Sequence, residues 1–291
     1  MVLFTVTNNV FAPCVFNLIE SYKLYSCNKE IFIIYYDLND DYIKLFKNKY
    51  GSQVNLIPVE KECEHAFNSR FYFPKAYALK IAHSLNKPFM LSDASNAFLY
   101  NTYELEYLVK EKSRFFIEYP TEIFKNKYWA TKKSLEIMKC NSVHHKEAQS
   151  YWSGFHAYEP TDENKQMIFD QYKLMLNSDI AGPSNLLNKP DGSDADCIAH
   201  RNDQTVLSLM INKYGFNQAF NIDKYNKFGD QQTAKFMLPD IFRNFDERKI
   251  CLYSRFSKNN NFKFIDNDLK SKLEKIFEMY NIDRNTGKII K

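Results

Sequence analysis

Two oxygen-bearing side chains, Asp93 and Ser95, follow shortly after an apolar run at residues 89–91. A short apolar run that comes after a helix-like segment indicates a buried central strand. Ligands of open α/β sheets bind outside the carboxyl ends of such strands, so Asp93 and Ser95 are expected to face a crevice. The alternative is a turn in which Asp93 caps the next element.

A second polar group, Arg201, Asp203 and Gln204, opens an amphipathic segment that ends at Gly215. It follows a stretch rich in Gly, Pro, Ser and Asp at residues 182–196, and loops of about 15 residues inside compact domains are usually functional. Asp203 is therefore a candidate for a functional carboxylate. Capping of the helix is the other role open to it, and the more common one for an isolated Asn-Asp pair.

The elements that position these groups alternate between β-type runs and helix-period segments, which is typical of a parallel, doubly wound sheet. We expect strands at residues 2–7, 30–36, 54–59, 89–91, 114–119 and 149–158. We expect helices at residues 15–25, 40–50, 73–85, 104–112, 162–176, 203–215 and 269–280. Lys75 and Lys80 are expected on the exposed surface of their helix. The lysine-rich segment at residues 125–140 is expected to be mixed and mobile.

Composition argues against several classes of protein. The net charge is +4, from 39 Lys and Arg against 35 Asp and Glu, and the basic residues are dispersed, so nothing indicates nucleic-acid binding. With only seven Gly, the chain has no Gly-x-Gly-x-x-Gly after its first strand and no Gly-x-x-x-x-Gly-Lys. A classical NAD site or a P-loop is therefore not expected, because both need glycines where the backbone approaches phosphate.

The six cysteines are far apart and include no Cys-x-x-Cys pair, which predicts free thiols in a reducing compartment. No run of about 18 apolar residues occurs, and the N-terminus reads as a strand instead of a signal segment. We therefore expect a cytoplasmic protein with no integral membrane segment.

Taken together, these segments resemble a glycosyltransferase of the GT-A fold, the nucleotide-diphospho-sugar transferase superfamily. The resemblance covers about residues 1–220 and rests on the order of the strands, the run around Asp93 and Ser95, the strand containing Trp152, and the segment from His200 to Gly215. It implies a Rossmann-like α/β fold with a mostly parallel central sheet flanked by helices. It also implies one domain over residues 1–291, with a nucleotide-binding half (1–100), an acceptor half (101–220) and an aromatic, basic C-terminal extension (221–291).

The family's Asp-x-Asp motif holds a divalent metal on the donor diphosphate, whereas Ser95 replaces the second carboxylate here. The chain is thus most similar to divergent branches with Asp-x-Ser. Two carboxylates suit Mg²⁺ or Mn²⁺ better than a carboxylate and a hydroxyl, so Asp93 is expected to be a weak metal ligand, and metal dependence weak or absent.

The resemblance also implies roles for other residues in binding the nucleotide-sugar donor. Thr7, Asn8 and Asp37 match the positions that hold base and ribose in the family, although Asp37 also suits a turn. Cations near the diphosphate would help to neutralise its charge, as a bound metal does. The candidates are Lys75, Lys80, Arg201 and, in the tail, Arg255 and Lys258.

On the acceptor side, Asp203 is expected to act as a base in an inverting reaction or as an electrostatic stabiliser in a retaining one, and its anionic form is favoured at a helix N-terminus. Gln204 is expected to touch the donor sugar, or else to be only the first exposed turn. Trp152 and His156 are candidates for the acceptor pocket, with a core role as the alternative for Trp152.

The function implied is transfer of a sugar from a nucleotide-diphospho-sugar to a glycan or a small acceptor. The alternative is a catalytically inactive GT-A-like protein that only binds a nucleotide or glycan, which the missing carboxylate would also explain. A nucleotidyltransferase is a weaker third possibility, since it would need a Gly-rich phosphate loop that the N-terminal region lacks.

Overall fold

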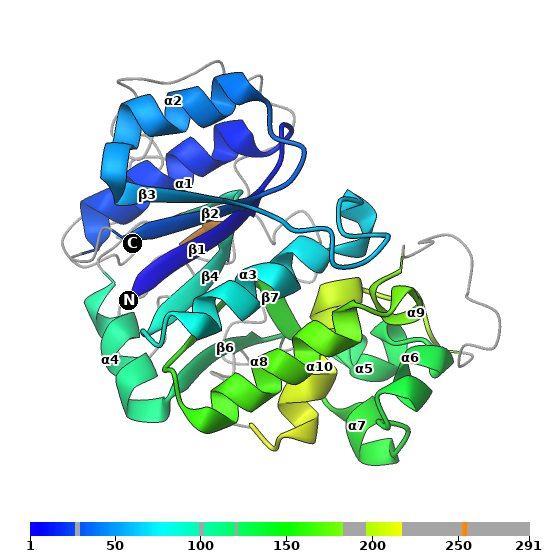
Figure 1. Cartoon of the computed structure of the whole chain (residues 1–291). Coiled ribbons are helices and arrows are strands. Elements are labelled where there is room, and N and C mark those ends of the chain that lie inside the picture. Colours follow the sequence, from blue (N-terminus) through cyan, green and yellow to red (C-terminus); the bar gives the residue numbers. More distant parts are fainter. Residues whose placement is uncertain (27–29, 99–101, 120–121, 183–195, 217–251, 255–291) are drawn as a thin grey trace, which may run out of the picture. The chain divides into compact units, whose positions relative to one another are not determined.

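The computed structural model describes residues 1–26, 30–98, 102–119, 122–182, 196–216 and 252–254 (Figure 1). Its main sheet has six strands in the order β3-β2-β1-β4-β7-β6 and is mostly parallel. These strands are β1 (Val2–Thr7), β2 (Ile31–Tyr35), β3 (Val54–Pro58), β4 (Phe89–Asp93), β6 (Arg114–Glu118) and β7 (Tyr151–Tyr158). The first four take the 3-2-1-4 order of Rossmann-like sheets. The predicted α/β class, with a mostly parallel sheet flanked by helices, is confirmed.

The chain forms two compact units. The first contains the described residues of Met1–Ile57 and Ser92–Glu111, together with β8 (Leu252–Ser254). The second contains the described residues of Pro58–Leu91 and Lys112–Asp223.

In the first unit, β1 and β2 pair in parallel, with Leu3 opposite Ile31. The helices are α1 (Ala12–Tyr25), α2 (Asp40–Tyr50) and α4 (Tyr103–Lys112), and a 3-10 turn, η1 (Gly51–Gln53), follows α2. A short antiparallel pair joins β5 (Asn96–Phe98) to β8. The boundaries of α2 follow from its sequence: Asn39 accepts a hydrogen bond from the N–H of Tyr42 at its start, and Gly51 takes a positive φ at its end.

In the second unit, β6 and β7 pair antiparallel, and three longer helices, α3 (Phe73–Ser84), α8 (Asp162–Met175) and α10 (Asn202–Lys213), pack together (Figure 1). The shorter elements are η2 (Ser69–Phe71), η3 (Glu122–Phe124), α5 (Asn126–Trp129), α6 (Lys132–Ile137), α7 (Val143–Glu147) and α9 (Ser178–Ala181). The segment at residues 125–140, expected to be mixed, thus holds two short helices, and Thr131 caps the second by accepting from the N–H of Ser134.

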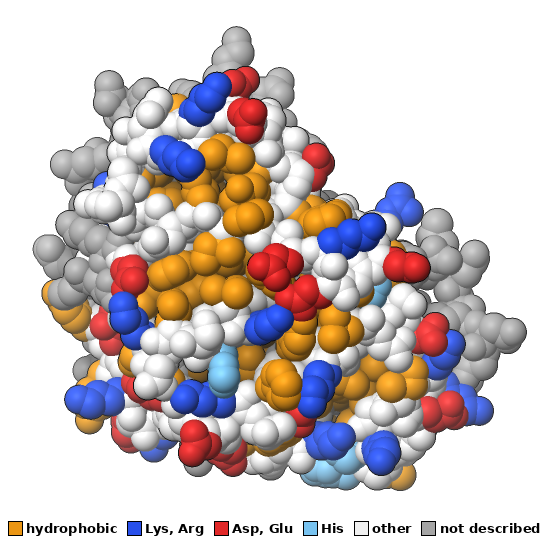
Figure 2. All heavy atoms as spheres, viewed as in Figure 1, with side chains coloured by type: hydrophobic (Ala, Val, Ile, Leu, Met, Phe, Trp, Pro, Cys, Tyr) orange, Lys and Arg blue, Asp and Glu red, His pale blue; other side chains and the backbone are white. Residues whose placement is uncertain are grey.

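The charged side chains, the lengths of the helices and the cysteines can be compared with the expectations from sequence. Lys, Arg, Asp and Glu side chains intermingle on the face shown in Figure 2, in keeping with the dispersed charge of the sequence. Among the described residues, no helix is long and apolar enough to cross a bilayer. Cys14, Cys63, Cys140 and Cys197 are free thiols, as expected. The helix expected at residues 269–280 lies outside the described residues.

Candidate active site

A largely buried ion pair joins two helix starts in the second unit. Lys75, in the first turn of α3, places its Nζ 2.9 Å from Oδ2 of Asp203, in the first turn of α10. The two side chains are only 15% and 8% exposed. Lys75 Nζ also lies 3.5 Å from the backbone carbonyl oxygen of Ser153 in β7, so three elements meet at this amine.

The structure corrects two expectations here. Lys75 was expected on the exposed surface of α3, but it is mostly buried because its ammonium faces Asp203. Asp203 does not cap its helix: the N-cap residue is Arg201, without a side-chain capping bond, and Asp203 lies inside the first turn. The Asp203 carboxylate instead accepts a charge-assisted hydrogen bond from the Lys75 ammonium.

Residues with positive φ precede both members of the pair. Tyr72, the N-cap residue of α3, has a φ of 55°, and Asn202, immediately before Asp203, has a φ of 40°. The side-chain amide of Asn202 donates to the carbonyl oxygens of Arg70, Ala181 and Gly182, at 2.8, 2.8 and 2.5 Å. Strained backbone that the surroundings hold in place concentrates at functional sites.

Buried polar atoms without a hydrogen-bond partner flank Asp203. His200 Nε2 lies 2.6 Å from the carbonyl oxygen of Ile180 and must donate to it, which leaves the other ring nitrogen, Nδ1, without a proton or a partner. Gln204 Nε2 is a buried donor that also has no partner among the described residues. Asp203 therefore lies in the sequence between His200, with an acceptor atom that has no partner among the described residues, and Gln204, with such a donor atom.

His156, the histidine expected in the acceptor pocket, is buried in β7 with 2% of its surface exposed. Burial, helped by the charge of Lys75, lowers the pKa of His156 to about 3. Burial also lowers the pKa of His200, although the Ile180 carbonyl and Asp203 oppose this. Both rings are therefore neutral at pH 7, and neither adds positive charge next to Lys75.

Acid is therefore expected to destabilise this protein through His156. Between an unfolded-state pKa of about 6.5 and the folded value of about 3, the unfolded chain holds a proton that the folded chain lacks. The free energy of unfolding should fall as the pH decreases through this range, by up to about 1.4 kcal/mol per pH unit for one histidine. Urea unfolding at pH 7, 6 and 5 measures the slope.

The variant His156→Gln provides the control for this slope, because it removes one titrating ring and leaves His200 in place. Its stability should depend on pH less steeply, by about one proton. An unchanged slope would show that folding does not lower the pKa of His156.

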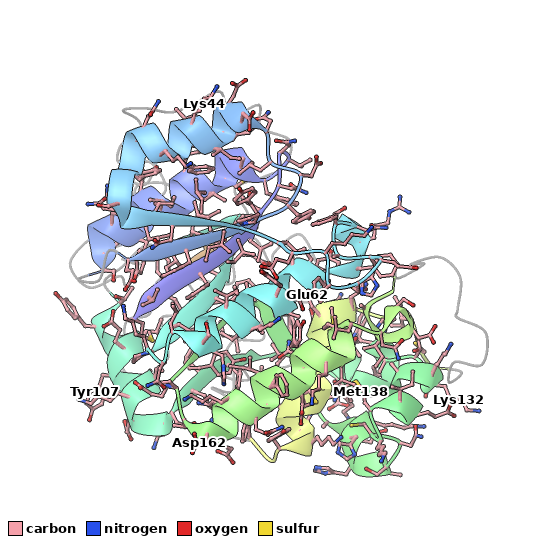
Figure 3. All side chains as sticks on the ribbon, viewed as in Figure 1. Lys44, Glu62, Tyr107, Lys132, Met138 and Asp162 are labelled. Carbon is pink, nitrogen blue, oxygen red and sulfur yellow. The ribbon has the colours of Figure 1, made fainter. Side chains whose placement is uncertain are left out.

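The remaining predicted residues of this unit have other partners. Lys80 Nζ lies 2.7 Å from Oε1 of Glu62 and 3.3 Å from the hydroxyl of Tyr172; Glu62 precedes α3 and is labelled in Figure 3. The Arg201 guanidinium stacks 3.8 Å from the centroid of the Trp129 ring.

Trp152 is half-buried and folds over Gly154, two residues along β7. A Cβ at Gly154 would come within 2.4 Å of the indole ring, so only glycine leaves room for this packing. The fold therefore brings together Lys75, Asp203 and His156 from the predicted set.

In the first unit, Thr7, Asn8 and Asp37 lie at the carboxyl ends of β1 and β2. Asn8 is occupied by local bonds: its Oδ1 accepts from the N–H groups of Val10 and Phe11, and its Nδ2 donates to the Tyr36 hydroxyl at 3.0 Å. Thr7 is buried and its hydroxyl donates to the carbonyl of Asn8. Asp37 has a φ of 47° and an exposed side chain. Of the three, Asp37 is the most accessible to a ligand.

Asp93 is the last residue of β4 and Ser95 lies in the two-residue turn before β5, with both side chains partly exposed. Asn96 fixes this turn by donating from Nδ2 to the hydroxyl of Ser92 at 3.0 Å. In the part of the chain that the structure describes, no three His, Cys, Asp or Glu side chains gather into a possible metal site. Asp93 and Ser95 offer one carboxylate and one hydroxyl, fewer anionic oxygens than the pair of carboxylates in Asp-x-Asp.

The chain resembles solved structures of other proteins. The apo structure of the bifunctional glycosyltransferase WbbM matches 75% of this chain with a TM-score of 0.45 and 9% sequence identity. The chain spans 37% of the length of that protein. No protein-family model and no curated protein matches the sequence.

Sequence reasoning missed three residues around the ion pair. The first is Tyr72, whose positive φ no local pattern indicates, since Asn and Gly are the residues usually found there. The second is Asn202, which the sequence places beside Asp203 but whose three acceptors come from distant segments. The third is His200, which lies two residues before Asn202, and its closeness to Asp203 in the sequence could have indicated it.

Proposed function

We propose that this protein is a GT-A-like glycosyltransferase that moves a sugar from a nucleotide-diphospho-sugar to a glycan or a small acceptor. The observation that carries the proposal is the buried pair of Lys75 and Asp203, 2.9 Å apart at the starts of two helices. A charged pair this deep is costly to desolvate and is weak evidence for a stabilising role. Its position among strained residues and unpartnered polar atoms supports a chemical one.

The proposed role of Asp203 is to accept a hydrogen bond from the acceptor hydroxyl while the hydroxyl oxygen attacks the donor sugar. Its Oδ2 faces Lys75, and Oδ1 is the oxygen proposed to face the hydroxyl. In an inverting reaction Asp203 takes the proton as the new glycosidic bond forms; in a retaining reaction it stabilises positive charge on the sugar. Lys75 holds the carboxylate in place in either case.

The donor is proposed to lie at the carboxyl ends of the strands of the first unit, where open α/β sheets bind nucleotides. The exposed carboxylate of Asp37 would accept hydrogen bonds from ribose or base N–H groups. Asp93 and Ser95 follow β4 at the corresponding strand end. The departing diphosphate would also need a cation to neutralise its charge.

A second function is favoured by two observations. The charge of Asp203 is already compensated by Lys75, and Ser95 leaves the Asp93 motif with one carboxylate. Both features would suit a protein that binds a nucleotide or glycan without transferring a sugar.

Incubation with UDP-, GDP- and CDP-sugars separates the two functions. At a donor concentration about 100 times Kd, the melting temperature should rise by about 5 °C for the correct nucleotide. Release of the matching nucleoside diphosphate, slow without acceptor and faster with it, supports a transferase. Stabilisation without any release supports a binding protein, and no stabilisation by any of the three contradicts the donor assignment.

A further inference from the structure

Tyr72 combines two unfavourable properties that packing alone does not explain. Its φ of 55° and ψ of 11° place a bulky aromatic residue in the left-handed region, which costs about 1–2 kcal/mol for residues with a Cβ. Its side chain is also 44% exposed, so a large part of its apolar surface gains nothing from burial. A strained and exposed aromatic ring is a candidate for ligand contact.

The ring lies beside the ion pair. The N–H of Lys75 donates to the carbonyl of Tyr72 at 3.1 Å, which closes the first turn of α3. The Lys75 ammonium then lies over the Tyr72 ring, 5.6 Å from its centroid, while it pairs with Asp203. The left-handed turn at Tyr72 is what brings this aromatic face next to the buried charges.

The ring and the ion pair beside it restrict what the ligand can be. An aromatic face binds an apolar surface, and a carboxylate accepts hydrogen bonds from hydroxyl groups. A pyranose ring carries several hydroxyls and also has an apolar C–H face that packs on an aromatic ring.

We infer that Tyr72 is the platform on which the pyranose ring of the acceptor stacks, beside the Lys75–Asp203 pair. The assignment of this ring to the acceptor rests on the proposed transferase function. The binding of a sugar at Tyr72 does not require transfer, and its test therefore uses no nucleotide.

The probes are four methyl glycosides: methyl β-glucoside, methyl β-galactoside, methyl α-mannoside and methyl β-N-acetylglucosaminide. Saturation-transfer NMR should show at least one of them bound to the wild-type chain and to Tyr72→Phe, which keeps the ring. The signal should fall at least about tenfold in Tyr72→Ala and Tyr72→Gly, because about 1.4 kcal/mol of stacking is lost. Tyr107→Ala is the matched control, since Tyr107 projects from α4 in the other unit and is 65% exposed (Figure 3).

Thermal unfolding of the same variants shows whether the backbone strain is real. Tyr72→Gly should unfold at a higher temperature than Tyr72→Ala, because both lack the ring and only glycine adopts this φ without cost. Tyr72→Gly also keeps the test valid if Tyr72→Ala fails to fold.

Three results would overturn the inference. They are no bound glycoside with the wild-type chain, equal binding by Tyr72→Gly and wild type, and an equal loss in Tyr107→Ala. Failure of glycoside binding would not affect the release of nucleoside diphosphate from donor sugars. Failure of this inference can therefore be distinguished from failure of the proposed function.

Discussion

Replacing Asp203 with asparagine is expected to reduce sugar transfer at least about 10³-fold while the donor nucleotide still raises the melting temperature. The amide keeps the shape of the side chain but can neither take a proton nor stabilise developing positive charge. The donor residues proposed in the first unit are unchanged in this variant. Nucleoside diphosphate release in the presence of acceptor, set beside the thermal shift with donor alone, measures both halves of the expectation.

The same substitution also affects stability, and this effect can be separated. Without Asp203 the Lys75 ammonium, only 15% exposed, loses its counter-ion, which typically costs about 3–5 kcal/mol for a buried pair. Lys75→Met leaves the Asp203 carboxylate uncompensated and should cost a similar amount. The double variant Lys75→Met/Asp203→Asn removes both charges and should recover most of the stability without recovering transfer.

The double-mutant cycle therefore discriminates between the two roles of the pair. Transfer that returns together with stability in the double variant would mean that Asp203 matters only for folding. Unchanged transfer in Asp203→Asn would remove it from the reaction altogether.

Replacing Asn202 with aspartate should cause a large loss of stability, although the two side chains have the same shape. The Asn202 amide nitrogen donates to three carbonyl oxygens, from Arg70, Ala181 and Gly182. Aspartate would lose these bonds and bring negative charge against three acceptors in a residue that is 2% exposed. We expect a loss of about 3–5 kcal/mol, measured by urea unfolding at pH 7.

Asn177→Asp is the matched control for this substitution. Asn177 caps α9 by accepting a hydrogen bond from the N–H of Asp179 at 2.9 Å, and aspartate accepts equally well at that position. Its stability should change by less than about 0.5 kcal/mol. Equal losses in the two variants would contradict the role of the Asn202 amide as a donor to the carbonyl groups of Arg70, Ala181 and Gly182.

The regular elements were largely predictable because their signals are local. The bounds of β1 and α2 agree with the expectation from sequence, since a run rich in β-branched and apolar residues defines the first and a polar start with a terminal glycine defines the second. The cap of α8 at Thr161 was predictable for the same reason, because its hydroxyl accepts from an N–H only three residues away.

The site was predictable only in its residue types. The pairing of Lys75 with Asp203 joins positions 128 residues apart, and no helical period indicates which lysine of α3 turns inward. Lys75 and Lys80 were equivalent as sequence features, yet the first is buried against Asp203 and the second faces Glu62. The positive φ of Tyr72 was hidden because aromatic residues rarely adopt it.

The packing of Trp152 over Gly154 has a practical consequence for spectroscopy. The chain has two tryptophans, Trp129 and Trp152, and both belong to the second unit. Tryptophan emission therefore reports on that unit alone, whereas circular dichroism averages over both. Melting curves from the two methods coincide only if the two units unfold in one cooperative transition. A comparison of the two curves therefore measures whether the units unfold together.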